Sequence, residues 1–426
     1  MGVLNFFIND IFGVASIFMS LIALVGLLLM KKSFSDIVTG VAKTALGVII
    51  LNQGVSVLVS SILPLATSIG ALQQSTPFPA DMIGSGDFGS QYGTYIGIAM
   101  ISGFAINLLV ARFTKFKTVF LTGHMLYWFP YVFTAVAVNV GFTGWTAGII
   151  GGVFAAVYYV VAPNLVRPYV REVVGDDSFT LGHPSVIFAL IGGTLAKWFG
   201  NKEKSTEDFE FPSSIKFLKE VAITGSLVVM LTYLVLIIIF KVTGSDVTID
   251  TGGVSLFQFV LTTGLMFGAG LTILMLGVRM LIAEITTAFT GIQEKLIPNA
   301  VPAYDCPLLF PYAPNAVILG FIIAMVASVA MIFLTGGLGI FKYAVVPAVI
   351  TCFFECGTGA VVGNAMGGRR GAIIAAVTSG VLLVILMGFS LPFVDKTIAD
   401  WMLVYGGQDF SLWAIIEGLI LKIFAH

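Results

Sequence analysis

The sequence predicts an all-α polytopic membrane protein, with about 10–11 transmembrane helices in two inverted repeats and with re-entrant hairpins. Of its 426 residues, 58% are hydrophobic and only 10% are charged, whereas soluble domains carry about 25% charged residues. The net charge of -1 gives no excess of positive charge for nucleic acid, and 3 Cys and 3 His are too few for a disulfide framework or a zinc cluster. These values exclude secreted, disordered and nucleic-acid-binding proteins.

Long apolar stretches supply the predicted helices, because a transmembrane helix needs about 20 mostly apolar residues. The stretches are 12–30, 37–63, 93–111, 118–140, 145–163, 221–240, 254–278, 314–335, 343–366 and 371–394. Two further stretches, 181–199 and 409–425, are interrupted or short. Asn9 and Asp10 precede the first stretch where a cleavable leader would have basic residues, so we expect a mature helix there.

The distribution of basic residues predicts the orientation in the membrane. Lys and Arg fall in alternate connections, which are expected to be cytoplasmic, and the intervening loop 64–92 has none. The pattern places the N-terminus outside and the C-terminus inside. Loop 64–92 is long for a connection, so it is either a lid over a site or a plain loop tip. The cytoplasmic basic residues are Lys31, Lys32, Arg112, Lys115, Lys117, Arg167, Arg171, Arg369 and Arg370.

The stretch 181–199 breaks this alternation, because basic residues lie on both sides of it. Gly182 and Pro184 near its start, with Gly192 and Gly193 further on, interrupt a regular helix. Irregular backbone at membrane depth is tolerated only where protein or an aqueous cavity covers it. We therefore expect a re-entrant hairpin here; the alternative is an ordinary span with basic residues at both ends.

The two halves of the chain resemble each other weakly. Leu46–Val48 is similar to Leu276–Val278, and 181–193 falls opposite 409–420. An odd number of spans per half means that the second copy is inverted, and inverted repeats place a substrate site near the bilayer midplane. The pattern favours a transporter over a channel, a receptor or an intramembrane enzyme.

Ionisable residues inside apolar stretches are candidates for function, because they are costly in lipid. His124 precedes an aromatic run that includes Tyr127 and Trp128, a combination that suits a sugar ligand. The alternative for His124 is a buried imidazole bonded to a backbone carbonyl. His183 lies at a predicted helix break, where nearby backbone groups are open to a ligand.

Three further candidates lie in the second half. Asp305 lies in a run with three prolines, 297–307, which forbids a regular helix and gives the carboxylate a cavity-facing setting. Glu355 lies in the middle of a span, where it binds substrate, carries a proton or pairs with another helix. Asn315 opens a span, either as a cap or as a substrate contact.

Three segments carry a resemblance to a known family. The segments Lys117–His124, Phe179–His183 and Lys295–Phe321 resemble the ascorbate-type enzyme IIC of the bacterial sugar phosphotransferase system. The last segment, with Asp305-Cys306 and Tyr312–Val317 in order, is the most specific. The resemblance covers nearly the whole chain.

The resemblance implies a homodimeric permease of the bacterial inner membrane that moves sugar by an elevator-like motion. A scaffold (1–64 and 221–300) would hold a mobile core (65–220 and 301–426), with hairpins near 181–199 and 409–425 or a terminal helix at the latter. A separate IIB protein, charged through IIA, would phosphorylate the sugar. The chain itself would be no enzyme and would need no cofactor or metal.

The resemblance also implies substrate contacts. His124, His183 and Asp305 match the family, whereas Trp128 and Pro184 stand where ascorbate carriers have glutamine. The resemblance therefore implies that the substrate is ascorbate or a related sugar acid or polyol. An ion- or proton-coupled secondary transporter, with Glu355 or Asp305 as coupling site, is the main alternative, and a sugar sensor is a third reading.

Overall fold

The computed structural model describes residues 14–71, 85–210, 214, 217, 220–244 and 249–424. Within these residues, 7 helices are long and apolar enough to cross a membrane. The longest of these stretches, Val349–Phe393, contains a kink, and shorter apolar helices occupy Ser16–Leu29, Met125–Val140 and Val186–Phe199. The chain is thus a mostly helical polytopic protein, as the composition predicts.

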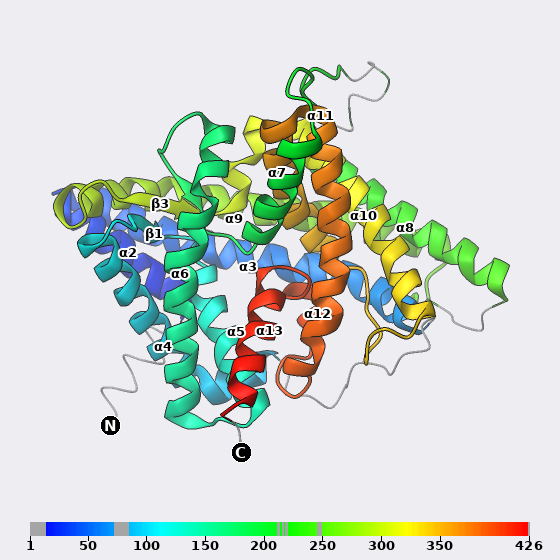
Figure 1. The fold of residues 1–426 in the computed structure, drawn as a ribbon, viewed down its shortest axis with the longest axis horizontal. Coiled ribbons are helices and arrows are strands. Elements are labelled where there is room, and N and C mark those ends of the chain that lie inside the picture. Colours follow the sequence, from blue (N-terminus) through cyan, green and yellow to red (C-terminus); the bar gives the residue numbers. More distant parts are fainter. Residues whose placement is uncertain are drawn as a thin grey trace.

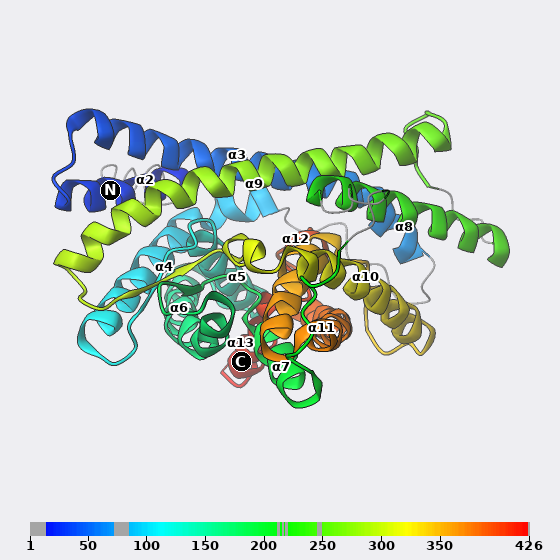
Figure 2. The same cartoon turned by 90° about the horizontal axis from the view of Figure 1, so that it is seen from above.

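Four helices form one side of the molecule, which we call the wall. Two of them, α3 and α9, are very long and lie side by side (Figure 2). A Cβ at Gly47 would lie only 2.8 Å from the backbone nitrogen of Leu281, and one at Gly277 would lie 2.4 Å from that of Leu51. Small residues at these crossings therefore allow the two backbones to touch. The wall helices are α2 (Ala15–Leu29), α3 (Phe34–Ala71), α8 (Val221–Thr243) and α9 (Leu256–Lys295).

The remaining helices form a second unit, which we call the bundle. Its longest member, α11, is kinked at Gly367 and Gly368, and Gly368 has a φ of 61° that disfavours any side chain. The freed carbonyl of Gly367 accepts a 2.7 Å hydrogen bond from the backbone N–H of Asn201. The bundle helices are α4 (Ser85–Phe113), α5 (Met125–Val140), α6 (Gly144–Val174), α7 (Val186–Phe199), α10 (Pro314–Gly337), α11 (Val349–Ser390), α12 (Trp401–Val404) and α13 (Asp409–Lys422). Short 3-10 turns are η3 (Cys306–Leu308), η4 (Phe310–Tyr312) and η5 (Leu391–Phe393).

A small parallel sheet in contact with α4 and α6 is a difference from the all-α prediction. Its order is β1-β3-β2, with β1 at Thr118–Phe120, β2 at Thr180–Leu181 and β3 at Val301–Tyr304. All three strands are buried, and the side chain of Asn107 bonds the backbone of Thr118 and of Phe120 along the edge of β1. The sheet satisfies backbone groups where the chain leaves helical geometry inside the protein.

Two predicted spans and one predicted loop differ from the structure. The stretch 118–140 is not one helix, because it begins as β1 and becomes helical only at Met125. The stretch 343–366 becomes helical at Val349, just after Pro347, which disfavours helix in the residues before it. Loop 64–92 is largely helical at both ends, within α3 and α4, and its centre, 72–84, lies outside the described residues.

The end of α13 lies beside the connection between α5 and α6. Leu421 packs with Ala137 and Ala147 at the connection between α5 and α6, which the charge pattern places outside. Figure 1 shows the end of α13 (red) on the lower side and the kink of α11 on the upper side. α13 thus runs from Asp409, whose carboxylate accepts the N–H of Val186 at the start of α7, to Leu421 beside the α5–α6 connection.

Candidate functional site

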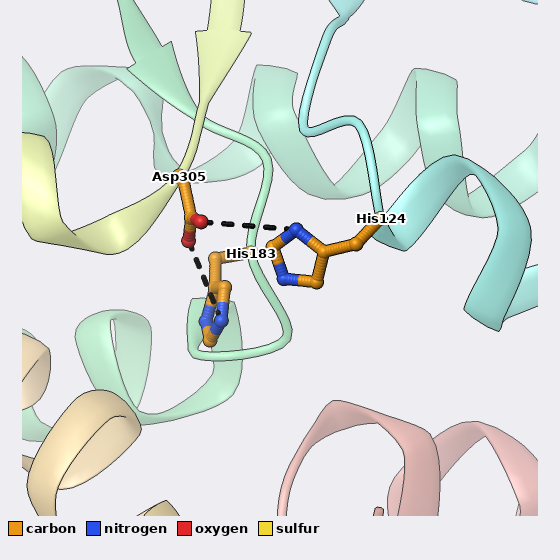
Figure 3. A group of neighbouring side chains, drawn as sticks. All are labelled: His124, His183 and Asp305. Atoms are coloured by element: carbon orange, nitrogen blue, oxygen red, sulfur yellow. Dashed lines mark ion pairs between the residues drawn. The ribbon is translucent and has the colours of Figure 1, made fainter. Parts of the chain in front are cut away.

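The three strand ends bring together the candidates that the sequence singles out. Asp305 directly follows β3, His183 lies two residues after the end of β2, and His124 lies four residues after the end of β1, where it is the N-cap residue of α5. Because the strands are parallel, their carboxyl ends meet at one edge of the sheet. Figure 3 shows the carboxylate of Asp305 directed at both imidazoles.

These three side chains form a buried cluster. Nε2 of His183 lies 3.5 Å from Oδ1 of Asp305, and Nδ1 of His124 lies 3.9 Å from Oδ2. The two imidazole centroids are 6.2 Å apart, and the exposed fractions of His124, His183 and Asp305 are 9%, 5% and 7%. Asp305 also accepts a 2.8 Å hydrogen bond from the backbone N–H of Cys306, which fixes its orientation. The cluster is held in place and nearly closed to the outside.

Glu355 extends the cluster from α11. Its Oε1 lies 3.9 Å from Nδ1 of His183, and its side chain is buried. Its Oε2 has no hydrogen-bond partner among the described residues, and the same holds for Nδ1 of His124 and Oε1 of Gln408. The three residues that carry these atoms, His124, Glu355 and Gln408, all line the same cavity.

This cavity of about 580 Å³ lies between the wall and the bundle. This volume falls in the range of about 300–1,000 Å³ that is typical of small-molecule sites. Residues of α3 and α9 form one face, and the strand ends, α5, α11 and α12 form the other. It is lined by Leu51, Asn52, Val55, Ser56, Val59, Ser60, Leu63, His124, Met125, Trp128, His183, Leu274, Val278, Asp305, Pro307, Ile350, Phe354, Glu355, Asp400, Val404, Tyr405, Gln408 and Phe410.

Trp128 also lines the cavity, one turn of α5 after His124. Its ring centroid lies 5.2 Å from that of Tyr131 and 5.3 Å from that of Tyr405, both in edge-to-face geometry. Tyr127 packs edge-to-face against Trp128 at 5.1 Å but does not line the cavity. The structure therefore places Trp128 at the cavity and Tyr127 behind it.

Asn315 lies away from this cavity. Its side-chain amide donates hydrogen bonds of 3.1 and 3.3 Å to the backbone carbonyls of Thr206 and Phe209. The carboxylate of Glu207 accepts the backbone N–H groups of Asn315 and Ala316 and so caps α10. Asn315 is thus bound to the segment that follows α7, and we propose no substrate contact for it.

Asp409 is a buried residue that the sequence analysis missed. Its carboxylate accepts the backbone N–H groups of Val186 and Ile187, at 3.1 and 2.9 Å, and the hydroxyl of Tyr158 at 2.6 Å. It therefore caps α7 directly after the loop that carries His183. The available signal for Asp409 and for Gln408 was the pair of glycines, Gly406 and Gly407, that directly precedes them.

The cluster also has the donor set of a metal site. One ligand atom from each of His124, His183 and Asp305 lies within 4.8 Å of the others. Two imidazoles and a carboxylate suit a divalent transition metal such as Zn²⁺. The same groups accept and donate hydrogen bonds to hydroxyl groups, and the unpartnered atoms of Glu355 and Gln408 extend beyond the metal-ligating set.

Comparisons with known proteins agree with the resemblance seen in the sequence. Residues 10–408 match the family EIIC-GAT, described as "PTS system sugar-specific permease component". The chain is also similar to the "Ascorbate-specific PTS system EIIC component" of Mycoplasma pneumoniae, with 26% identity over 451 residues. That alignment covers 94% of this chain and 68% of the relative.

Proposed function

The chain belongs to the family of sugar-specific permease components of the phosphotransferase system, and from this premise we propose that it carries L-ascorbate or a related sugar acid or polyol into the cell. It is a transporter subunit, and with its 7 apolar helices it is a multi-pass protein of the bacterial inner membrane. A separate IIB protein, charged through IIA, phosphorylates the sugar at the cytoplasmic face. The phosphorylated product is charged and no longer fits the site, so uptake is driven by trapping.

One observation carries this proposal: His124, His183 and Asp305 form a polar cluster that lines a cavity large enough for a small molecule. Imidazoles both donate and accept hydrogen bonds, and carboxylates accept them from hydroxyl groups. A polyhydroxylated ligand satisfies these groups together. A purely apolar ligand would leave them unpaired at a cost of about 1–3 kcal/mol each.

The position of the cavity supports an elevator-type movement. It lies between the wall, which we equate with the scaffold, and the bundle, which we equate with the mobile core. All the ionisable lining groups belong to the bundle, so the polar half of the site travels as one unit when the bundle slides. We further propose that two copies associate through their scaffolds as a homodimer in the lipid bilayer.

The proposal is tested by uptake into membrane vesicles supplied with phosphoenolpyruvate and the cognate IIA and IIB proteins. Labelled ascorbate and related sugars are offered in turn, and the expected result is accumulation of one labelled sugar phosphate. Asp305→Asn should abolish accumulation without reducing the amount of protein in the membrane. Accumulation of unmodified sugar, independent of phosphoenolpyruvate, would contradict the proposal.

A second candidate function rests on Glu355. A buried carboxylate with an unpartnered oxygen, 3.9 Å from an imidazole, is an arrangement that can carry a proton in a secondary transporter. In that case uptake would follow the proton gradient, would be abolished by an uncoupler and would not need IIB. Glu355→Gln would then remove the coupling, whereas under the leading proposal it would lower only the affinity for sugar.

A further inference from the structure

A second cavity lies in the bundle, apart from the proposed sugar site. Its volume is about 340 Å³, and none of the described residues lines both cavities. It lies between α10 and the part of α11 that follows the kink, two helices that pack side by side (Figure 2), and the segment after α7 borders it. The lining residues are Thr206, Phe209, Asn315, Ile318, Leu319, Ile322, Arg369 and Ile373.

Arg369 is the one charged residue among the described residues that line this cavity. Its backbone N–H donates a hydrogen bond to the carbonyl of Lys204, which fixes the residue at the kink. Its guanidinium forms no ion pair or hydrogen bond with any other described residue, whereas the guanidinium of Arg167 pairs with Asp177 at 3.0 Å. An unpaired guanidinium keeps all of its N–H donors for a ligand.

The other polar groups beside the cavity are already bonded. The carboxylate of Glu207 accepts the backbone N–H groups of Asn315 and Ala316, at 3.3 and 3.2 Å, and the hydroxyl of Thr206 at 2.9 Å. The side-chain amide of Asn315 donates to the carbonyls of Thr206 and Phe209. A ligand that enters the cavity therefore finds one open polar partner among the described residues, the guanidinium of Arg369.

Aliphatic side chains continue from the arginine along both helices. On α11, Arg369, Ile373 and Val377 recur every four residues and so lie on one face of the helix. On α10, Ile322 and Val326 have the same spacing. These four aliphatic side chains are between 39% and 67% exposed, so in a bilayer they contact lipid acyl chains.

The arginine lies near one surface of the membrane. With 24 residues, α10 is about 36 Å long, which is enough to cross the hydrocarbon core, and its lining residues lie within its first turns, 314–322. The distribution of basic residues predicts that Arg369 is cytoplasmic. Anionic lipids give the cytoplasmic leaflet a negative surface potential.

We propose that this cavity binds an anionic glycerophospholipid, with the phosphate on Arg369 and an acyl chain in the groove between α10 and α11. A guanidinium donates two parallel hydrogen bonds to phosphate oxygens, which gives the contact a fixed geometry as well as charge. A zwitterionic lipid carries the same phosphate together with an ammonium group, and no described acid lines the cavity to receive that second charge. The site therefore prefers a lipid whose headgroup has a net negative charge.

Native mass spectrometry of the full-length protein in detergent tests this with two lipids of identical acyl chains. Palmitoyl-oleoyl phosphatidylglycerol should bind more tightly than palmitoyl-oleoyl phosphatidylcholine by about fivefold, the factor expected for one basic residue beside an anionic lipid. Arg369→Gln should remove this preference. Arg112→Gln is the matched control and should keep it, because Arg112 is an exposed, predicted cytoplasmic arginine at the end of α4 that does not line the cavity.

A second variant tests the groove. Ile373→Trp enlarges a side chain that is 40% exposed, so it should fill the groove without unfolding the protein and should weaken the binding of both lipids. A soluble probe separates a lipid site from an anion site. Glycerol 3-phosphate carries the charge of the headgroup without acyl chains, and it should not compete with phosphatidylglycerol.

Four outcomes overturn the inference. They are equal affinity for the two lipids, a preference that survives Arg369→Gln, an equal loss of preference in Arg112→Gln, and unchanged binding of both lipids in Ile373→Trp. Competition by glycerol 3-phosphate would also overturn it, because the cavity would then hold a free anion. None of these results concerns the sugar cavity, so accumulation of sugar phosphate decides the proposed function separately.

Discussion

The two faces of the cavity differ in what they offer a ligand. The wall contributes aliphatic side chains such as Val55 and Leu274, with Asn52, Ser56 and Ser60 as its polar groups. The bundle contributes every ionisable lining group, from His124 to Asp400. Under the proposed function, the bundle supplies the ionisable contacts to the ligand, while the wall supplies a mostly aliphatic face. If this division is correct, substitutions on the bundle side should weaken ligand binding, and substitutions on the wall side should lower the stability of the protein.

The largest effect is expected for Asp305→Asn. Asp305 lies within 4 Å of both imidazoles and is the acceptor at the centre of the cluster. Loss of the charged acceptor should cost about 3 kcal/mol of binding, which is more than a hundredfold in Kd. Titration calorimetry of the variant measures this. The melting temperature should stay within a few degrees, and normal binding would remove Asp305 from the site.

Gly47→Ala should act on the wall without touching the ligand. The added Cβ would lie 2.8 Å from the backbone nitrogen of Leu281, so α3 and α9 must separate. Overpacking of this kind costs about 1–3 kcal/mol of stability. The measurement is thermal unfolding in detergent. Gly93→Ala is the control, because a Cβ there meets nothing within 4 Å; an equal loss of stability in both variants would contradict the argument.

Asp409→Asn tests whether the cap on α7 holds the loop that carries His183 in place. The amide keeps one acceptor oxygen, so the N–H groups of Val186 and Ile187 and the hydroxyl of Tyr158 can no longer all be satisfied by it. The loop that carries His183 should loosen, and sugar affinity should fall by about tenfold, or 1.4 kcal/mol. Tyr158→Phe removes one of the three donors to Asp409 and the 3.3 Å bond of that hydroxyl to the carbonyl of His183, but it keeps both backbone caps and should weaken binding less. Unchanged affinity in Asp409→Asn would show that the loop does not depend on this cap.

The smallest effect is expected for Ser56→Ala on the wall. Its hydroxyl already bonds the carbonyl of Asn52 in its own helix, so it has little to give a ligand. Affinity should change less than twofold, an amount of about 0.4 kcal/mol. The same titration measures it. A tenfold loss of affinity would show that the wall contacts the substrate, and it would contradict the division between the wall and the bundle.

Much of the bundle side was predictable from the sequence. His183 and Asp305 sit among helix breakers, and helix breakers inside apolar stretches mark cavities. The strands that align them were not predictable, because runs of two to four residues are too short to show an alternating pattern. Whether 409–425 forms a hairpin or a terminal helix was left open, since its position depends on contacts of Leu421 with Ala137 and Ala147, far earlier in the chain.

The contacts of Asp409 have a consequence for the order in which the protein matures. The carboxylate that caps α7 lies 223 residues after Val186 in the chain. A nascent polypeptide that has inserted its first half into the membrane therefore still lacks the acceptor for the turn beside His183. The ribosome must therefore synthesise the chain as far as Asp409 before the start of α7, beside His183, gains this cap.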